Sequence, residues 1–293
     1  MLKELSGKTA VITGGAGGIG RGIATAVAAE GVNVALVDID GAALDVAVHE
    51  IAWRSNVKVR GFRCDVSERP AVYRLADDIE REMGNIHILC NNAGVSRPGV
   101  ELDQLADDDF DWIMGVNLFG VQNCLRAFLP KIRGHGEGGH IVNTASIGGL
   151  RISRGTLNAA YGASKMATVS LSVSLEELLE GSGIGVSVLC PQATNTNINT
   201  TTRVRPERFG GPDDRDLHPE FTETLRHGLS GEDVGRFVLH ALKHGEFFVL
   251  SHPHVRAEVE EWHKRVLDGF DRAEMTAKEL DLRVRPTPAP GKR

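Results

Sequence analysis

Cysteine is scarce in this chain, with four residues among 293, at Cys64, Cys90, Cys124 and Cys190. No two of them form a Cys-x-x-Cys pair, so the sequence indicates neither a disulfide framework nor a zinc site. Three of the four lie beside apolar runs typical of strands, and we expect all four to be small buried hydrophobic residues. Such use of cysteine is typical of a reducing compartment, and we expect a cytoplasmic protein.

The chain also lacks an excess of positive charge and a long apolar run. Its formal net charge of -6 has the wrong sign for a surface that neutralises phosphates, so no nucleic-acid partner is expected. The longest stretch without Asp, Glu, Lys or Arg, residues 181–202, is rich in Asn, Thr and Ser and is no bilayer span. Residues 1–8 contain no apolar stretch of signal-peptide length. We therefore expect no membrane association.

The chain does contain a regular alternation of short β-branched runs and longer amphipathic segments. Several short runs are apolar at successive positions, as in parallel strands that helices cover on both faces. This alternation predicts right-handed βαβ units and an α/β fold with one doubly wound, seven-stranded parallel sheet. The expected strands are residues 9–13, 33–37, 58–63, 86–90, 140–144, 185–189 and 247–250. The expected helices are residues 18–30, 42–53, 71–83, 110–133, 159–180 and 232–244.

Two regions break this alternation. Residues 195–230 are polar and carry several prolines and glycines, so we expect a loop or lid there. After the last strand, residues 255–271 are expected to form an amphipathic helix, and the proline-rich end, 286–293, is expected to be disordered. We therefore predict one domain over residues 1–251 and a C-terminal extension over residues 252–293.

A glycine-rich turn joins the first expected strand to the first expected helix. It reads Thr13-Gly14-Gly15-Ala16-Gly17-Gly18-Ile19-Gly20. Glycines let the backbone approach a ligand closely, and free N–H groups at a helix N-terminus favour a pyrophosphate. Asp38 ends the second strand close to the ~20 residues after the turn that are expected for a carboxylate binding a ribose. The pattern predicts a dinucleotide site.

Asp38 also predicts which dinucleotide binds. Its carboxylate can accept hydrogen bonds from both adenosine ribose hydroxyls, whereas a 2′-phosphate would meet like charge at a cost of roughly several kcal/mol. No Arg or Lys follows immediately to compensate. We therefore expect NAD rather than NADP. In the alternative interpretation, Asp38 only starts a turn with Asp40 and Gly41.

Tyr161 precedes Lys165 by one helical turn, so the two side chains share a face. A phenol with a pKa near 10 is a poor base at neutral pH, but an ammonium and the positive nicotinamide of NAD favour the phenolate. Lowering this pKa toward 7 takes about 4 kcal/mol. On its own, Tyr-x-x-x-Lys is more often a surface pair. Ser146, however, follows the strand 140–144 at the carboxyl edge, where open α/β sheets bind ligands.

These motifs, in this order, resemble the single-domain short-chain dehydrogenase/reductase family over roughly residues 5–250. The resemblance implies a Rossmann fold with helices on both faces of the sheet and NAD-dependent oxidation of an alcohol. The matching motifs are Thr13-Gly14…Gly18-Ile19-Gly20, Asp65-Val66, Asn91-Asn92-Ala93-Gly94, Asn117, Ser146 and Tyr161-Gly162-Ala163-Ser164-Lys165.

The resemblance implies a role for each matching residue. Tyr161 would be the general acid/base, and Lys165 would lower its pKa and bind the nicotinamide ribose. Ser146 would bond the substrate oxygen, and Asn117 would hold a helix irregularity and a water. The cofactor-binding residues that it implies are Gly14, Gly17, Gly18, Ile19, Gly20, Asp38, Asp65, Val66, Asn91, Ala93, Gly94, Tyr161, Lys165, Pro191, Thr194 and Thr196.

The chain departs from the family pattern at two positions. Pro191-Gln192 stands where the family usually has Pro-Gly, which affects the backbone beside Thr196, the residue expected at the carboxamide. His87 stands where the family often has Asp, and we expect a structural role for it. No metal is expected: His240 and His244 have a spacing that can bind metal, but the pattern lacks the accompanying Glu.

The substrate is indicated by weaker patterns. Residues 110–117, 203–210 and 252–256 resemble bacterial Cα-dehydrogenases, which oxidise the benzylic hydroxyl of lignin-derived β-aryl ethers to a ketone. The polar lid residues favour an oxygenated substrate, because unpaired buried polar groups are costly, although a solvated loop explains the same composition. Cyclic, steroid or sugar alcohols, the reverse reduction and a non-catalytic NAD(H) sensor remain alternatives. The family resemblance also implies a homodimer or homotetramer.

Overall fold

The computed structural model describes residues 2, 4–152, 158–213 and 219–283. Contacts within the chain divide it into two compact units, Met1–His252 and Pro253–Arg293. The second unit contains a short 3₁₀ turn, Pro253–Val255, and helix α9, Arg256–Glu279, which extends beyond the residues expected from the sequence. The predicted disorder of residues 286–293 lies outside the described residues.

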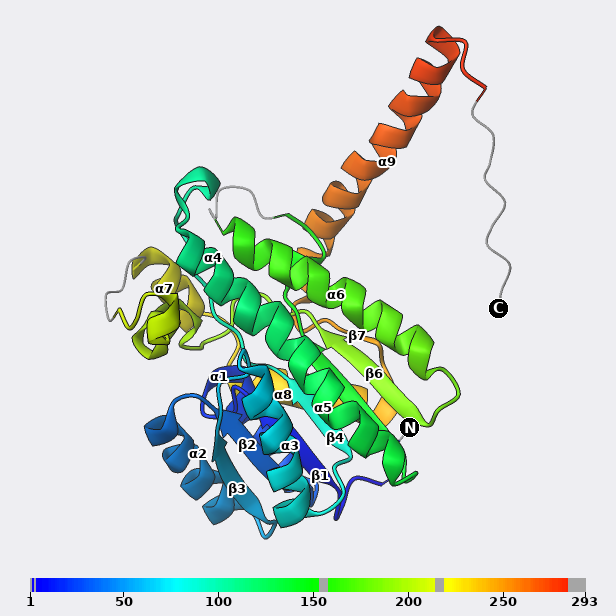
Figure 1. Ribbon diagram of the computed structural model, residues 1–293. Coiled ribbons are helices and arrows are strands. Elements are labelled where there is room, and N and C mark those ends of the chain that lie inside the picture. Colours follow the sequence, from blue (N-terminus) through cyan, green and yellow to red (C-terminus); the bar gives the residue numbers. More distant parts are fainter. Residues whose placement is uncertain (1, 3, 153–157, 214–218, 284–293) are drawn as a thin grey trace. The chain divides into compact units, whose positions relative to one another are not determined.

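The first unit is built on one seven-stranded parallel sheet with the strand order β3-β2-β1-β4-β5-β6-β7 (Figure 1). This arrangement confirms the predicted doubly wound fold. The first crossovers build β3-β2-β1 on one side, and the chain then returns to build β4 to β7 on the other. The strands are β1 (Thr9–Thr13), β2 (Asn33–Asp38), β3 (Val59–Arg63), β4 (Ile88–Asn91), β5 (Gly139–Thr144), β6 (Ile184–Leu189) and β7 (Phe248–Val249).

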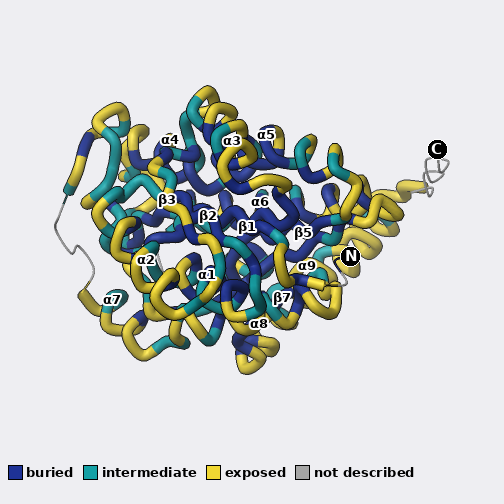
Figure 2. Tube along the Cα trace, turned by 90° about the horizontal axis from the view of Figure 1, so that it is seen from below, coloured by how far each residue is buried: buried dark blue, intermediate teal, exposed yellow. Residues whose placement is uncertain are grey.

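Helices cover both faces of the sheet, and each face has its own hydrophobic core. One core packs α3, α4, α5 and α6 against the sheet, and the other packs α1, α2 and α8. In Figure 2 the strands β1, β2 and β5 run dark blue through the centre, between these helices. The helices of this unit are α1 (Gly18–Ala29), α2 (Gly41–Arg54), α3 (Arg69–Met83), α4 (Asp107–Met114), α5 (Val121–Gly134), α6 (Ala159–Leu179), α7 (Pro219–Arg226) and α8 (Gly231–His244).

The buried strands explain the continuous apolar runs of the sequence. All five residues of β1 are buried. Val11 belongs to the core under α3 to α6, whereas Ala10 and Ile12 belong to the core under α1, α2 and α8. Because successive side chains of a strand point to opposite faces, a strand covered on both faces is apolar at every position.

The expected helix over residues 110–133 is interrupted. The structure divides it into α4 and α5, joined by a π-helical turn, Gly115–Gly120. Single π-turns inside longer helices are frequently found at functional sites. The hydrophobic period alone did not reveal this turn, because the chain stays helical through it.

The polar region 195–230, which we expected to be a loop or lid, contains short helical segments. Within its described part, the chain forms the 3₁₀ segments Ile198–Val204 and Glu207–Phe209 and the helix α7. Two of the prolines that suggested a loop stand at helix starts: Pro206 is the N-cap of the second 3₁₀ segment, and Pro219 is the first residue of α7. We call residues 195–230 the lid.

Helices α1 and α8 approach each other backbone to backbone. A Cβ atom added to Gly22 would lie 1.8 Å from the carbonyl oxygen of Gly231, and one added to Gly235 would lie 2.3 Å from that of Gly22. Only glycine fits at such a contact. The seam fixes the helix that follows the glycine-rich turn. Among the described helices, none is long and apolar enough to cross a membrane.

Candidate active site

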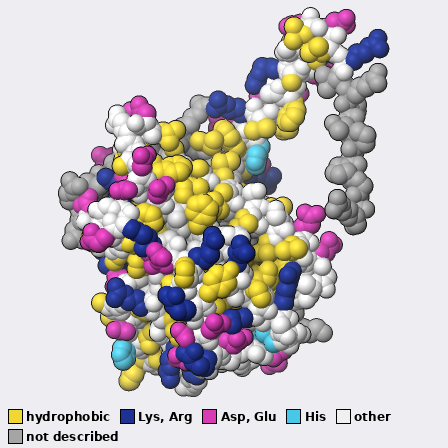
Figure 3. All heavy atoms as spheres, viewed as in Figure 1, with side chains coloured by type: hydrophobic (Ala, Val, Ile, Leu, Met, Phe, Trp, Pro, Cys, Tyr) yellow, Lys and Arg dark blue, Asp and Glu magenta, His cyan; other side chains and the backbone are white. Residues whose placement is uncertain are grey.

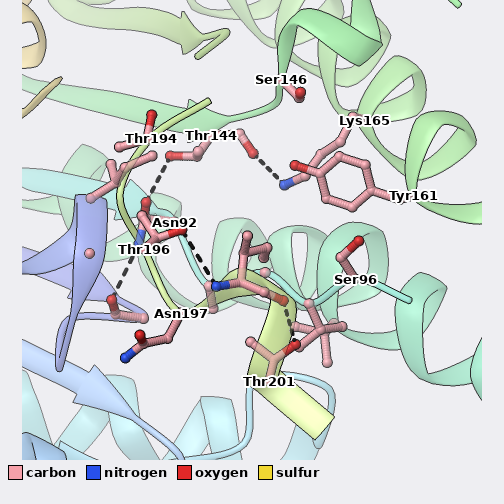
Figure 4. Close-up of a pocket in the computed structure, with 18 of the residues that line it drawn as sticks. Asn92, Ser96, Thr144, Ser146, Tyr161, Lys165, Thr194, Thr196, Asn197 and Thr201 are labelled. Atoms are coloured by element: carbon pink, nitrogen blue, oxygen red, sulfur yellow. Dashed lines mark hydrogen bonds between the residues drawn. The ribbon is translucent and has the colours of Figure 1, made fainter. Parts of the chain in front are cut away.

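A cavity of about 810 Å³ opens at the carboxyl ends of the strands and is lined by loops that follow β1, β2, β4, β5 and β6. This is the edge at which open parallel sheets bind ligands. The cavity extends from the glycine-rich turn and Asp38 to Ser146, Tyr161 and Lys165, and lid residues line it as well. Figure 4 shows its polar side chains, with Lys165 and Tyr161 side by side.

The glycine-rich turn is shaped to receive an anion. Gly14 and Gly18 adopt positive φ angles of 63° and 49°, which L side chains rarely adopt. Gly17 is the N-cap of α1 and has no side chain to cap the helix. A Cβ atom added to Gly17 would meet nothing within 4 Å, so there is open space in front of the first helical turn. The arrangement suits a pyrophosphate at the helix N-terminus.

Asp38 is held at the end of β2 by two backbone donors. Its carboxylate accepts a hydrogen bond from Ala16 N at 3.0 Å and another from Asp40 N at 3.0 Å. Burial raises the pKa of this carboxyl above its usual value, and the two backbone N–H groups oppose the rise. Asp38 therefore presents a fixed acceptor to the cavity.

Asn92 links the glycine-rich turn to the end of β5, two residues before Ser146. Its Nδ2 donates to the carbonyl oxygens of Thr13 and Gly14 at 3.0 and 3.3 Å. Its Oδ1 accepts from Thr144 Oγ1 at 3.3 Å. The Asn91-Asn92-Ala93-Gly94 stretch thus connects the two halves of the cavity through its second residue.

Tyr161, Ser146 and Lys165 come together at the other half of the cavity. Tyr161 and Lys165 lie one turn apart in α6, as expected from their spacing, and Lys165 Nζ is 5.5 Å from the centre of the phenol ring. Nζ donates to the carbonyl oxygen of Thr144 at 2.8 Å, which holds the amine in place. Ser146 follows β5 and lines the same cavity as the phenol, where its Oγ accepts from Gly148 N at 3.1 Å and donates to the carbonyl oxygen of Pro191 at 3.5 Å. These are the positions a proton-transfer site requires.

Burial shifts the pKa values of Tyr161 and Lys165, and that of Tyr161 moves in the opposite direction to the one expected from the sequence. Burial raises the pKa of the Tyr161 phenol above its ordinary value, and the nearby Ser146 hydroxyl only partly opposes the rise. Burial also lowers the pKa of the Lys165 amine to about 8. In the chain alone, the lysine therefore does not lower the phenol pKa as the sequence led us to expect. Burial disfavours the charged form of each group because the cavity wall removes water from it, although an amine with a pKa of about 8 still carries its proton at neutral pH.

Asn117 supports the cavity from behind rather than lining it. It lies in the π-helical turn and is fully buried. Its Oδ1 accepts from Val95 N at 2.8 Å, and its Nδ2 donates to Val95 O at 3.0 Å and to Ser164 Oγ at 3.1 Å. Ser164 Oγ in turn donates to the carbonyl oxygen of Tyr161 at 2.7 Å. The amide therefore links the chain after β4 to the helix that carries Tyr161.

The loop after β6 forms the last wall of the cavity. Pro191, Thr194 and Thr196 all line it, as expected. A Cβ atom added to Gly18 would lie 2.7 Å from Thr196 Cγ2, so Thr196 sits directly over the glycine-rich turn. Thr194 is bridged to Leu229 near the end of the lid.

Most of the residues singled out from the sequence line one cavity, but three do not. Asn91 was expected to line the cleft, but the structure does not place it in the cavity wall: it is the last residue of β4, is buried, and donates to Asn143 Oδ1 at 2.8 Å. Gly20 packs away from the cavity, where an added Cβ would lie 2.1 Å from the carbonyl oxygen of Gly14. Asn117 is the third. The remaining residues line it: Gly14, Gly17, Gly18, Ile19, Asp38, Asp65, Val66, Ala93, Gly94, Ser146, Tyr161, Lys165, Pro191, Thr194 and Thr196.

Sequence reasoning missed the roles of three lid arginines, which pair with carboxylates of the sheet domain. Arg203 contacts Asp40 at 2.6 Å, Arg208 contacts Asp65 at 2.7 Å, and Arg205 contacts Asp109 at 2.6 Å. The side chains of Arg205 and Asp109 are about 90% buried, and Arg205 also lies over the ring of Trp112, a residue of the cavity wall. The three ion pairs hold the lid against the cavity. The clustered arginines were a signal, but their partners are distant in sequence.

Histidine and cysteine take structural positions. His87 Nδ1 accepts from Thr9 N at 3.2 Å, and its Nε2 pairs with Glu137 at 2.9 Å, at the opposite end of the sheet from the cavity. His135 lies beside them. The nitrogen and oxygen atoms by which His87, His135 and Glu137 could bind a metal ion are within 4.8 Å of one another. The neighbouring ring is engaged as well, since His135 Nε2 bonds Ile86 O at 2.8 Å. All four cysteines are buried and free, as expected.

Comparison with known proteins identifies the family. A family model described as "short chain dehydrogenase" matches residues 8–207. A C alpha-dehydrogenase from Sphingobium sp. (strain NBRC 103272 / SYK-6) is 32% identical over 92% of this chain and 88% of its own length. A 3beta-hydroxysteroid dehydrogenase 2 from Eggerthella lenta is 36% identical over 70% of this chain and 77% of its own.

A solved structure agrees with these matches. The short chain dehydrogenase/reductase SDR from Burkholderia phymatum in complex with NAD has a TM-score of 0.84 and 34% identity, covering 97% of this chain and 99% of that one. The chain therefore belongs to the short-chain dehydrogenase family and is an oxidoreductase acting on CH–OH groups.

Proposed function

We propose that this protein oxidises a secondary alcohol to a ketone with NAD, using Tyr161 as the general base. The observation that carries the proposal is the single cavity in which Tyr161, Ser146 and Lys165 share a wall with the glycine-rich turn and Asp38. One ligand-sized space thus reaches both a pyrophosphate cradle and a phenol. A redox cofactor and its substrate require such a continuous site.

NAD fits the residues at the first half of the cavity. The open space before Gly17 and the uncapped first turn of α1 suit the pyrophosphate, and Asp38 would accept hydrogen bonds from the adenosine ribose. The carboxylate also disfavours a 2′-phosphate. Two arginines lie nearby, and both are engaged: Arg203 is paired with Asp40 at 2.6 Å, and Arg63, which stands opposite Asp38 on β3, donates from Nε to the carbonyl oxygen of Ile39 at 3.1 Å. These contacts support NAD over NADP.

The residues at the other half would move the proton. A bound NAD would supply the acceptor for the hydride that leaves the alcohol carbon. Tyr161 would take the hydroxyl proton as phenolate, and Ser146, which lines the same part of the cavity, would hold the substrate oxygen beside it. The Lys165 amine, anchored on Thr144 O at 2.8 Å, would stabilise the phenolate and bind the nicotinamide ribose. Asn117 holds α6 in place through Ser164 and would position a water for onward proton transfer.

For the substrate we propose an aryl secondary alcohol of the lignin-derived β-aryl ether type. The support comes from the similarity to the Sphingobium Cα-dehydrogenase over most of both chains. The cavity wall also contains an aromatic residue, Trp112, and apolar side chains of the lid, beside hydroxyl and amide groups from Ser96 and Asn158. An apolar ring with oxygen substituents matches such a mixed lining.

A steroid or other cyclic alcohol is the second candidate, because the Eggerthella 3beta-hydroxysteroid dehydrogenase is similar over most of this chain. A screen with NAD distinguishes the two classes. Racemic β-aryl ether alcohols, hydroxysteroids and sugar alcohols are each incubated with the full chain, and NADH formation is read by absorbance. Turnover of the aryl ethers at least tenfold above the others is expected. Turnover of only steroids would reject the aryl substrate, and NAD binding without any turnover would favour a sensor.

We also propose that the protein self-associates. Figure 3 shows hydrophobic side chains gathered on the face of the molecule over α4, α5 and α6. On this face, Phe119, Val173 and Leu178 are 47–62% exposed. Exposed apolar patches of this kind often mark protein–protein interfaces. Sedimentation velocity of the full chain should give a dimer or tetramer, and a monomer at micromolar concentration would contradict the proposal.

A further inference from the structure

His252 is the last residue of the sheet domain and lies against the loop that follows β6. It is 8% exposed. Its two ring nitrogens hold two successive residues of that loop: Gln192 N donates to Nδ1 at 3.2 Å, and Nε2 bonds the carbonyl oxygen of Ala193 at 3.1 Å. The imidazole thus forms a hydrogen bond with the loop backbone through each of its two ring nitrogens, a pair of contacts that we call the clamp.

These partners define the protonation state of the ring. A backbone N–H can only donate, so Nδ1 must accept and carries no proton. A carbonyl oxygen can only accept, so Nε2 must carry the proton and donate to Ala193 O. Ser251 Oγ, 2.8 Å from Nδ1, lies on the accepting nitrogen as well. The clamp therefore requires neutral His252 in one tautomer.

The loop that His252 holds connects directly to the proposed catalytic serine. The carbonyl oxygen of Pro191, one residue before Gln192, accepts from Ile147 N at 2.9 Å and from Ser146 Oγ at 3.5 Å. Gln192 and Ala193 themselves line the cavity. A shift of this loop would move both the cavity wall and the acceptor of Ser146.

We infer that His252 is a positioning residue for the nicotinamide end of the cofactor, acting through the backbone of Gln192 and Ala193. The inference rests on the proposed function and on the expectation that Thr196, which follows in the same loop and lines the cavity, contacts the carboxamide of the nicotinamide. The same loop carries Gln192 where the family usually has glycine. His252 accepts the hydrogen bond of the Gln192 N–H from outside the cavity. This contact fixes the backbone conformation of Gln192, a residue that lacks the conformational freedom of the glycine usually found there.

The test separates the two ends of the dinucleotide. ADP-ribose contains the adenosine and pyrophosphate but lacks nicotinamide, so it reports the half of the cavity that His252 does not touch. Kd values for NAD and ADP-ribose are measured by calorimetry on the full chain and on H252F, H252N and H252Q. The control is H140N, which alters another buried histidine, bonded to Ser187 Oγ between β5 and β6.

For H252F, we expect the Kd for NAD to rise about tenfold, which is about the worth of losing two neutral hydrogen bonds, while the Kd for ADP-ribose stays within about twofold. H252N retains an acceptor near Nδ1 and H252Q a donor near Nε2, so each should recover part of the loss. H140N should lower the melting temperature and leave the ratio of the two Kd values unchanged.

Equal losses for NAD and ADP-ribose in H252F, or an unchanged ratio, would show a merely structural histidine and overturn the inference. If the variants fail to fold, the wild-type chain still decides: the ring ¹⁵N signals of His252 should shift when NAD is added but not when ADP-ribose is added. Identical spectra with both ligands would also overturn it. If the wild type binds ADP-ribose but not NAD, or neither, the proposed function fails instead, which is a distinguishable result.

Discussion

The amine of Lys165 lies 5.5 Å from the centre of the Tyr161 ring, yet the ring keeps a raised pKa in the chain alone. The amine donates to the carbonyl oxygen of Thr144, and burial disfavours both the phenolate and the ammonium. In the chain alone, the phenol therefore favours its protonated form. The additional positive charge of the nicotinamide is what would bring the phenol into the useful pH range.

Replacing Tyr161 by phenylalanine should remove turnover and leave NAD binding nearly intact. The variant loses the phenol oxygen but keeps the ring that packs at the cavity wall. We expect kcat to fall at least a hundredfold, consistent with the loss of a general base, while the Kd for NAD changes less than about threefold. Steady-state kinetics and calorimetry give the two values. Retention of more than a few per cent of kcat would reject Tyr161 as the base.

Lys165 should set the pH profile of alcohol oxidation. The reaction needs the phenolate, so kcat rises with pH as Tyr161 loses its proton at saturating NAD. Removing the ammonium in K165M destabilises the phenolate, so the rising limb should move to higher pH by at least one unit. The matched control is K131M, which changes a lysine of α5 that is paired with Asp77 and Glu80 of α3. A shift in both variants, or in neither, would contradict this role.

Asp38 should determine the choice of dinucleotide. We expect kcat/KM for NAD to exceed that for NADP by about a hundredfold or more, since like charge at the 2′-phosphate costs several kcal/mol. D38A should narrow this ratio at least tenfold, mainly through the KM for NAD. D45N, which alters an exposed carboxylate of α2, serves as the control. A wild-type preference for NADP would overturn the assignment.

The ion pair between Arg205 and Asp109 should stabilise the folded lid. Both side chains are about 90% buried, so R205M leaves a buried carboxylate whose remaining cation, Arg97, is 3.6 Å away. We expect the free energy of unfolding to fall by about 3 kcal/mol and the KM for substrate to rise. The exposed pair of Arg226 with Glu223 is the comparison: R226M should cost less than about 1 kcal/mol. Equal losses measured by urea unfolding would contradict a role for burial.

His140 should make the protein lose stability in mild acid. Burial lowers the pKa of its imidazole to about 4, whereas the unfolded chain titrates near 6.5. Between these values the unfolded state binds more protons, so stability falls as pH falls from 6.5 to 4, by up to about 3 kcal/mol. Urea unfolding at pH 7 and pH 5 should show a smaller difference for H140N than for the wild type. H49N, at an exposed position of α2, should keep the wild-type difference.

Much of the fold could be predicted because its signals are local. A strand buried on both faces must be apolar throughout, as β1 is, and Tyr161 and Lys165 share a helix face by their spacing alone. The π-turn at Gly115–Gly120 could not be predicted, because it preserves the helical pattern of the residues around it.

The contacts that complete the site are not local. Arg203 and Asp40 are far apart in the sequence, and so are Gln192 and His252. No periodicity relates such pairs, and only the folded chain brings them together. Asn91 was misplaced for a related reason: neighbouring strand residues face opposite sides, and it is Asn92 that turns toward the cavity.

The backbone seam between α1 and α8 has a consequence for altering the enzyme. Gly231, directly after the lid, lies so near the carbonyl oxygen of Gly18 that an added Cβ would be 2.2 Å from it. The end of the lid is therefore held against the glycine-rich turn by backbone contact. The rest of the lid is attached to the sheet domain mainly through the ion pairs of Arg203, Arg205 and Arg208. Substitutions in the lid after Thr196, with its three arginines kept, should therefore change the substrate side of the cavity and leave the glycine-rich turn in place, provided that glycine is kept at 22, 231 and 235.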